Sequence, residues 1–216
     1  MRKEKFVTGE YYHVFNRGVD KRDIFMDEAD VLRFFQGMND FNTTEPIGSI
    51  YEKTFYKDSL SDNKDGKLVN FIAYCLNPNH YHFLLEQLVD NGISLLMAKI
   101  GGGYASYFNE KNKRVGSLFQ GRFKAKHISS NDYLLHVSTY VNLNNLVHGL
   151  GPPNLENRIK SSWEEYRTKE RAFCEKDIIL GQFKTTKEYE IFAKEALELM
   201  IEKKKNDKEI SSLMFD

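Results

Sequence analysis

A chain of 216 residues with 41% hydrophobic and 13% aromatic residues is long enough for one domain plus an appendage and too apolar to be disordered. Its 31 basic and 31 acidic residues argue against a uniformly charged polyanion-binding protein. Two distant cysteines, Cys75 and Cys174, exclude a disulfide framework, and no apolar run approaches the ~20 residues that span a bilayer, so we expect a soluble, cytoplasmic protein.

The first elements in chain order are a strand and a helix. Tyr11–Asn16 is aromatic-rich and β-prone and is closed by Arg17-Gly18, which predicts a strand. Residues 27–40 carry apolar side chains at helical spacing behind an acidic first turn, which predicts a helix. Residues 42–68 are polar and lack a periodic run, and we interpret them as an insertion.

The middle of the chain predicts two strands followed by a long helix. Phe71–Leu76 is a candidate for a buried strand, Asn77-Pro78-Asn79 for a turn and His80–Leu88 for the next strand. Apolar and aromatic residues from Ile93 to Phe108 follow a helical spacing. Within this helix, each of the glycines 101–103 is destabilising by roughly 1 kcal/mol relative to alanine. We therefore expect a break there, or a close approach of the backbone to a ligand.

The next segment completes the predicted fold. Leu118–Ile128 alternates apolar and basic residues, which predicts a strand that bears Arg122 and Lys124. Several N-cap residues then precede a helix that we expect over residues 133–146. The order β-α-β-β-α-β-α predicts an α+β fold of the ferredoxin-like split βαβ type, with an antiparallel sheet and helices on one face.

The sequence changes character at Gly151-Pro152-Pro153. We therefore predict one domain over residues 1–150, including the insertion at 42–68, and a helical C-terminal extension over residues 151–216. Residues 187–216 contain six lysines and eight acidic residues, a mixture that is typical of a helix with a solvated face.

The neutral net charge conceals a local basic stretch. Between Lys99 and His127 there are seven cations and one anion, so this stretch carries +6 and the rest of the chain −6. Contact with backbone phosphates needs such a stripe, whereas a solvated helix end and loop is the alternative. The cations are Lys99, Lys111, Lys113, Arg114, Arg122, Lys124 and Lys126.

Two pairs of residues carry the chemistry. In His80-Tyr81-His82, both imidazoles project to one face of a strand, which supplies half of a metal site unless the pair is incidental. Tyr140 and Asn144 are four residues apart and share one face of a helix. The Asn144 amide oxygen suits Mg²⁺ or Mn²⁺, and Tyr140 could act beside it; a half-buried packing tyrosine is the alternative reading.

These residues lie within a series of sequence blocks that occur in order between about residues 10 and 167. The blocks are YHVFNRG at 12–18 with Ile24-Phe25, AYCLNPNHYHFLL at 73–85, YASYFN at 104–109, GSLFQGRFK at 116–124, YLL through YVNLN at 133–144, and SSWEEY at 161–166. The ordered set resembles the HUH single-tyrosine transposases (IS200-like transposases), in particular the branch of REP-associated tyrosine transposases. Asn77, Tyr81 and Asn145 depart from the family's usual residues, and none of these changes removes a reacting atom.

The resemblance implies a metal-dependent endonuclease and strand-transferase that acts on hairpin-forming single-stranded DNA. In it, His80 and His82 match the metal-binding histidines, Asn144 the amide that completes the site, and Tyr140 the nucleophile that forms a 5′-phosphotyrosine and releases a 3′-OH. It also implies Mg²⁺ or Mn²⁺ as cofactor, a symmetric homodimer, no membrane partner and a nucleoid-associated cytoplasmic location.

Further roles and alternatives remain open at the level of sequence. His136, one turn before Tyr140, is a candidate assisting base, and His13 and His127 are interpreted as structural. The candidate DNA contacts are Arg17, Arg114, Arg122, Lys124, Lys126 and, by stacking on bases, Tyr104. Tyr104 could instead be a core residue, and Arg17 could simply close the first strand. A domesticated nucleic-acid-binding protein without turnover is the alternative function, and a hydrolase of small phosphoesters would leave Tyr140 without a role.

Overall fold

A five-stranded antiparallel sheet lies at the centre of this computed structural model, which describes residues 5–45, 66–150, 156–168, 170 and 172–213. The strand order is β4-β1-β3-β2-β5, with β1 at Tyr11–Arg17, β2 at Val69–Asn77, β3 at His80–Gln87, β4 at Lys124–His127 and β5 at Lys160–Ser161. β3 lies between β1 and β2 and is antiparallel to both. This is the split βαβ arrangement that the sequence predicts. Most of the predicted insertion, residues 46–65, lies outside the described residues.

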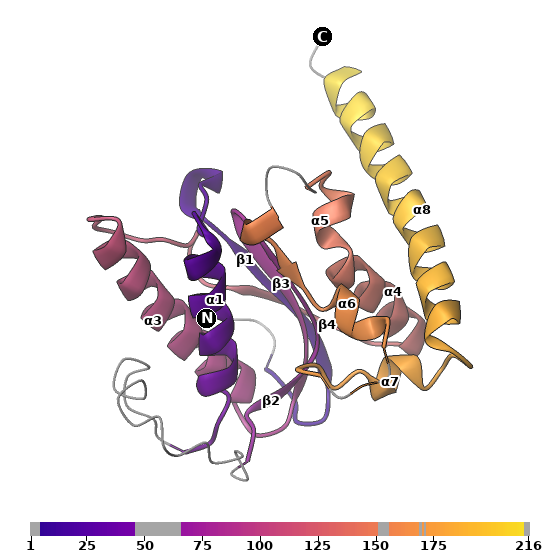
Figure 1. The fold of residues 1–216 in the computed structure, drawn as a ribbon, viewed down its shortest axis with the longest axis horizontal. Coiled ribbons are helices and arrows are strands. Elements are labelled where there is room, and N and C mark those ends of the chain that lie inside the picture. Colours follow the sequence, from indigo (N-terminus) through magenta and orange to yellow (C-terminus); the bar gives the residue numbers. More distant parts are fainter. Residues whose placement is uncertain (1–4, 46–65, 151–155, 169, 171, 214–216) are drawn as a thin grey trace.

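Helices cover both faces of the sheet (Figure 1). The first face carries α1 (Glu28–Asp40) and α3 (Gly92–Lys111), and the second carries α4 (Asn131–Asn142), α5 (Asn144–Val147), α6 (Trp163–Tyr166), α7 (Asp177–Leu180) and α8 (Thr186–Leu213). The α+β class and the antiparallel sheet are confirmed, but the expectation of helices on one face is wrong. The reason is that the central strands are apolar on both sides: Phe83 packs in the first core and Leu84 in the second.

The C-terminal part of the chain belongs to the second helical layer. β5 pairs with β2, and a short 3-10 helix, η2 (Glu156–Arg158), precedes it. Tyr166 of α6 and Tyr189 of α8 are completely buried against the same sheet. The predicted extension is therefore helical for most of its described length and also adds a strand, whereas the boundary at residue 150 stays a prediction. Among the described residues, no helix has the length and apolarity needed to span a membrane.

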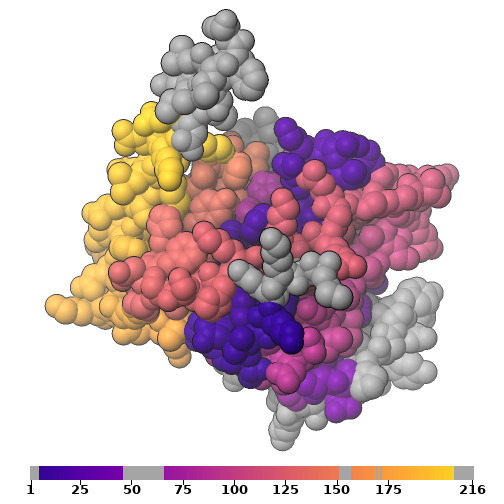
Figure 2. Space-filling model, turned by 180° about the vertical axis from the view of Figure 1, so that it is seen from behind, coloured from indigo at the N-terminus to yellow at the C-terminus, as the bar shows by residue number. Residues whose placement is uncertain are grey.

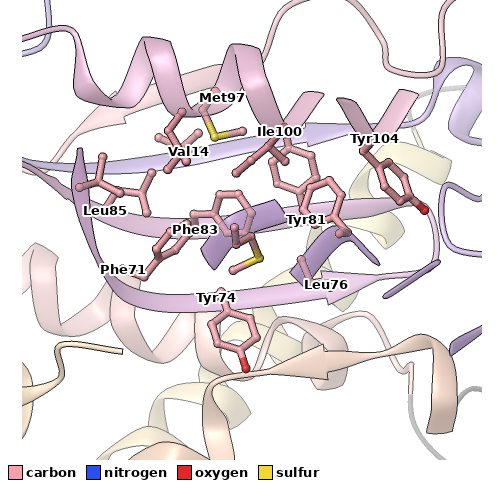
Figure 3. Packing of buried hydrophobic residues seen from close by; sticks show 14 of the residues in the cluster. Val14, Phe71, Tyr74, Leu76, Tyr81, Phe83, Leu85, Met97, Ile100 and Tyr104 are labelled. Atoms are coloured by element: carbon pink, nitrogen blue, oxygen red, sulfur yellow. The ribbon is translucent and has the colours of Figure 1, made fainter. Parts of the chain in front are cut away.

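The first core lies between α3, α1 and the sheet. Figure 3 shows Val14, Phe83 and Leu85 of the sheet facing Met97 and Ile100 of α3. α3 continues without a break through the glycines 101–103, so the predicted break is wrong. Its apolar face is buried on the sheet, and tertiary packing of this kind outweighs a low helix propensity. A Cβ added at Gly101 or Gly102 would meet nothing within 4 Å, and one at Gly103 would lie 3.4 Å from the Phe41 ring.

The boundaries of β4 and α4 also differ from the sequence expectations. Residues 118–123 are irregular rather than strand, since Gly121 turns the chain at φ +71° before β4 begins at Lys124. α4 begins at Asn131, two residues before the predicted start, because the Ser130 side chain accepts a hydrogen bond from the backbone N–H of Tyr133. Leu143, with φ −111° and ψ 17°, then separates α4 from α5. Tyr140 and Asn144 consequently lie on successive helices rather than on one.

Candidate active site

A pocket of about 410 Å³ opens on the second face of the sheet. Its lining includes His80, His82 and Tyr140, together with the cationic side chains Arg17, Lys21 and Lys124. The pocket forms where β1, β3 and β4 meet the helical layer that contains α4 and α5. Candidate metal ligands, the candidate nucleophile and candidate phosphate contacts therefore share one cavity.

The alternation of β3 directs its two histidines into this pocket. Tyr81, Phe83 and Leu85 point into the first core, whereas His80 and His82 line the pocket on the opposite face. His80 is half-buried and His82 is 8% exposed. A rigid central strand paired on both sides holds the imidazoles in place.

His80 is fixed by a group of asparagines. Its Nδ1 lies 2.5 Å from Asn79 Oδ1, which can only accept, so the neutral ring carries its proton on Nδ1. The unprotonated Nε2 lies 3.0 Å from a second acceptor, Asn144 Oδ1. Asn77 Nδ2 donates to Asn144 Oδ1 at 2.8 Å and lies 3.0 Å from His80 Nε2. Two lone-pair donors of this kind, held side by side, are suited to a shared cation.

His82 is paired with His13, which the sequence reasoning interprets as structural. His13 Nε2 lies 2.8 Å from His82 Nδ1, and both rings are buried. When His82 donates this hydrogen bond, its Nε2 is left as a lone pair. His13 thus adjoins the site through His82, because β1 is paired with β3 so that alternate residues of both strands share this face, and its interpretation as a structural residue stays a prediction. His127 lies outside, with its Nε2 2.8 Å from Glu10 Oε2.

Tyr140 lies over the two paired histidines. Its half-buried ring meets the His82 ring edge-on at 5.4 Å and the His13 ring at 5.7 Å between centroids. Burial raises the pKa of Tyr140, and the side chain of Asn144 opposes this rise by hydrogen bonding. Asn144 is completely buried, and within the described residues its Nδ2 has no partner at full hydrogen-bond distance. The Asn144 amide therefore presents its oxygen to His80, and its buried Nδ2 stays without such a partner within the described residues.

Burial also keeps His13, His80 and His82 neutral. It lowers the pKa of His13 to about 4, with a further contribution from Lys126. It lowers the pKa of His80, and that of His82 well below the usual value. The cations Lys204 and Arg17 depress the pKa of His80 further. A neutral imidazole keeps the lone pair that a metal ligand needs.

The donor set fits a hard divalent cation. The 3.0 Å between His80 Nε2 and Asn144 Oδ1 matches the edge of an octahedron with metal–ligand bonds of ~2.1 Å, which is about 3.0 Å. His82 supplies the second nitrogen, and the amide oxygen is the hard ligand that Mg²⁺ prefers over thiolate. Among the described residues, no group of three or more His, Cys, Asp or Glu side chains is arranged to hold a metal.

The predicted DNA-contacting cations are separated by the fold. Arg17 and Lys124 line the pocket, with Arg17 hydrogen-bonded to Gln120, and Lys126 lies beside it on β4 with its Nζ 4.9 Å from the centre of the Tyr133 ring. Arg122 lines a different cavity, of about 920 Å³, along α3. Arg114 lies at a third one, with its guanidinium 5.8 Å from the centre of the Phe108 ring.

Tyr104 is a core residue, which corrects its assignment as a base-stacking contact. Its side chain is 4% exposed, and the ring packs edge-on against Phe34 at 4.9 Å on the first face of the sheet. The hydroxyl donates a hydrogen bond to the carbonyl oxygen of Ile24. Figure 3 shows the ring inside the cluster that includes Ile100 and Tyr81. Because core side chains already cover the Tyr104 ring, a DNA base cannot stack on it.

Other residues of the pocket are not evident from the sequence. His136 is exposed on α4, and the ring contacts described for Tyr140 involve His13 and His82, so its role as a base stays a prediction. His148, by contrast, lines the pocket and meets the His80 ring edge-on at 5.0 Å. His148 directly follows α5, and α5 is separate from α4 because Leu143 interrupts the helix. No periodicity in the sequence predicts this interruption.

Two of three comparisons with known proteins give a match. Residues 47–144, a little under half of the chain, match the model of a family described as "Transposase IS200 like". This span contains His80, His82, Tyr140 and Asn144. No curated protein matches the chain. A solved structure of a REP-associated tyrosine transposase bound to a REP hairpin is similar with a TM-score of 0.50 and 12% identity, over 76% of this chain and 83% of that one, which is a likeness of fold.

Proposed function

Because residues 47–144 match the model of the IS200-like transposase family, we propose that the protein is a metal-dependent endonuclease and strand-transferase that acts on hairpin-forming single-stranded DNA. The observation that carries this proposal is the convergence of Tyr140, two neutral histidines and several cations in the lining of one pocket, with the buried Asn144 amide oxygen 3.0 Å from His80 Nε2. Each group has a role in phosphodiester transfer, whereas a hydrolase of small phosphoesters would leave Tyr140 without one.

The ligands of the cation would be His80 Nε2, the free nitrogen of His82 and Asn144 Oδ1. When bound, a divalent cation such as Mg²⁺ or Mn²⁺ acts as a Lewis acid that polarises the scissile phosphate and orients it for in-line attack. Asn79 and His13 orient the two imidazoles from behind, since each bonds the ring nitrogen that faces away from the proposed cation position.

Tyr140 is the proposed nucleophile. Its oxygen forms a bond to the scissile phosphorus as the bond from phosphorus to the 3′ oxygen breaks, which gives a 5′-phosphotyrosine and a free 3′-OH. Overall the phenolic proton ends on the departing 3′ oxygen. Since burial raises the pKa of Tyr140, the phenol is protonated at neutral pH and must lose its proton during attack. The Asn144 N–H stabilises the developing phenolate, and His136 remains the proposed assisting base.

The phosphotyrosine intermediate also explains strand transfer. The phosphotyrosine keeps the phosphodiester energy, so a 3′-OH from another strand can reverse the step and join there. Arg17, Lys21, Lys124 and Lys126 are the proposed contacts to the DNA backbone, because they line or border the pocket. The hairpin form of the substrate and a symmetric homodimer are proposed on the family resemblance.

The test is an adduct assay with labelled hairpin oligonucleotides taken from the flanks of the gene. In Mg²⁺ or Mn²⁺ the protein is expected to form a covalent adduct that survives denaturing electrophoresis. Tyr140→Phe should abolish the adduct and retain DNA binding, and chelation of the metal should have the same effect. Tyr133→Phe, on the same helix, is the matched control and should form the adduct normally.

Two outcomes would contradict the proposal. Adduct formation by Tyr140→Phe would show that another residue is the nucleophile. Salt-sensitive DNA binding without any adduct from the unaltered protein would favour a domesticated nucleic-acid-binding protein.

A further inference from the structure

The C-terminal helix reaches back to the candidate active site through one lysine. Lys204 of α8 donates from Nζ to the carbonyl oxygen of Val147 at 3.0 Å and lies 2.8 Å from His148 Nδ1. Figure 1 shows α8 alongside α4 and α5, and in Figure 2 its yellow surface adjoins the coral surface of that segment. His148 itself lines the pocket that contains Tyr140 and His80. A residue at the far end of the chain thus contacts a wall of the site.

The lysine determines which nitrogen of His148 carries the proton. The ammonium group of Lys204 has only donors, so His148 Nδ1 must accept. The neutral ring therefore carries its proton on Nε2 and can donate from that atom. A positive charge on the accepting side polarises the ring, which strengthens the Nε2–H as a donor. The second hydrogen bond, to the carbonyl of Val147, fixes the lysine against the end of α5.

His148 lies on the same side of the pocket as Tyr140, so its Nε2–H could donate to a phosphate bound there. The cations of the pocket come from β1, the 3-10 helix η1 (Val19–Lys21) and β4, whereas Tyr140 and His148 are its lining residues from the helical layer. A phosphate held between these two sides would receive a donor from the nucleophile's side. In the reaction proposed above, the phosphate oxygens have no contact assigned on this side.

We propose that His148 is a further catalytic residue, whose Nε2–H donates a hydrogen bond to a non-bridging oxygen of the scissile phosphate. Lys204 is a positioning residue that sets the tautomer and the place of His148. This inference rests on the proposed function. A preorganised donor aimed at a phosphate oxygen stabilises the charge that develops there during attack, and it acts on the rate more than on binding.

Single-turnover adduct formation with the labelled hairpin oligonucleotide tests the role of His148. His148→Ala should lower the rate at saturating protein by about 100-fold, the size expected for one lost donor. The protein concentration that gives half of the maximal rate should stay the same. Lys204→Met should lower the saturated rate by a smaller factor, and Lys204→Arg should restore it. Lys205→Met, an exposed lysine on the same helix, is the matched control and should behave as the unaltered protein.

A second measurement follows the tautomer without using activity. Long-range ¹H–¹⁵N NMR correlations should show His148 protonated on Nε2 in the unaltered protein and in Lys204→Arg, and a mixture of tautomers in Lys204→Met. Equal saturated rates for the unaltered protein and His148→Ala would overturn the catalytic role while leaving the proposed function intact. An unchanged tautomer in Lys204→Met would overturn the positioning role. Absence of adducts from the unaltered protein would overturn the proposed function, and this inference with it.

Discussion

Four of the six histidines cluster on the second face of the sheet, where His80, His82 and His148 line one pocket and His13 contacts His82. Imidazoles can gather this closely because burial lowers the pKa of the three strand histidines, so that they carry no charge near neutral pH. Each ring also has a partner that assigns its proton: a second histidine, an asparagine or a lysine. The tautomers, rather than the histidines alone, prepare the pocket for a cation and a phosphate.

A first consequence concerns His13. His13→Leu removes the hydrogen-bond partner of His82 Nδ1, so it should weaken binding of Mn²⁺ by about 10- to 100-fold, the usual effect of losing an outer partner of a metal ligand. His13→Gln keeps an acceptor and should lose less affinity. Titration of free Mn²⁺ by electron paramagnetic resonance measures both. His127→Leu, which breaks a hydrogen bond to Glu10 outside the pocket, is the control, and equal affinities for His13→Leu and His127→Leu would refute this role.

At the scale of elements, a buried polar network holds α4, the helix that carries Tyr140, in place. Asn142 Nδ2 donates to the Tyr189 hydroxyl of α8 at 2.9 Å, and that hydroxyl lies 3.2 Å from Ser138 Oγ. Asn142 Oδ1 accepts from Ser162 Oγ at 2.5 Å, at the junction of β5 and α6. All four side chains are completely buried. The position of α4, and hence of Tyr140, therefore depends on two segments that follow it in the chain.

Tyr189→Phe tests this fastening. The change leaves Asn142 Nδ2 buried without its acceptor, so the free energy of unfolding should fall by about 1–3 kcal/mol. Tyr133→Phe removes a hydroxyl from a half-buried ring of α4 and should change the free energy by less than about 0.5 kcal/mol. Urea unfolding followed by circular dichroism compares the two variants. Identical midpoints would mean that the network does not stabilise the fold.

At the scale of the whole molecule, the positively charged surface beside the site is smaller than the basic stretch of the sequence suggests. Lys111 lies 2.7 Å from both Asp27 and Asp30, so its charge is neutralised within the protein. Arg114 lies at a separate cavity. Lys124 and Lys126 remain beside the candidate site. A neutral protein can in this way present a positive potential over one pocket.

The dependence of DNA binding on salt should reveal this division. Lys124→Ala should weaken binding of the hairpin oligonucleotide and reduce the slope of log K against log salt by about 0.7, the value for one phosphate contact on a single strand. Arg114→Ala should leave both quantities unchanged, because its guanidinium lies at another cavity. Fluorescence anisotropy at several salt concentrations measures both variants. A larger loss for Arg114→Ala than for Lys124→Ala would contradict the placement of the DNA at this pocket.

The elements with a strong local signal could be predicted from the sequence. β1, β2 and β3 follow from short β-prone runs with turn residues between them, and α1 from its spacing and its acidic start. The shared direction of His80 and His82 follows from the alternation of a strand. These features depend on neighbours within a few residues, which a single sequence displays.

The remainder depends on contacts between distant residues. His13 meets His82 across 69 positions and Lys204 meets His148 across 56, and neither pairing leaves a periodic trace in the sequence. The burial of Tyr104, the second covered face of the sheet and the unbroken α3 likewise result from tertiary packing, which outweighs local propensity. The interruption at Leu143 places Asn144 on a new helix, so even the spacing of four residues does not describe the site fully.

The docking of α8 also orders events during protein synthesis. Lys204 follows Tyr140 by 64 residues in the chain. At roughly 5–20 residues per second, the ribosome adds this stretch in about 3–13 s. For that time a growing chain has Tyr140 without Lys204 to set His148, and over the first 49 residues it also lacks Tyr189 to hold α4. The pocket is therefore complete only after α8 has been synthesised. A prematurely terminated product would carry Tyr140 without the residues that hold α4 and His148 in place.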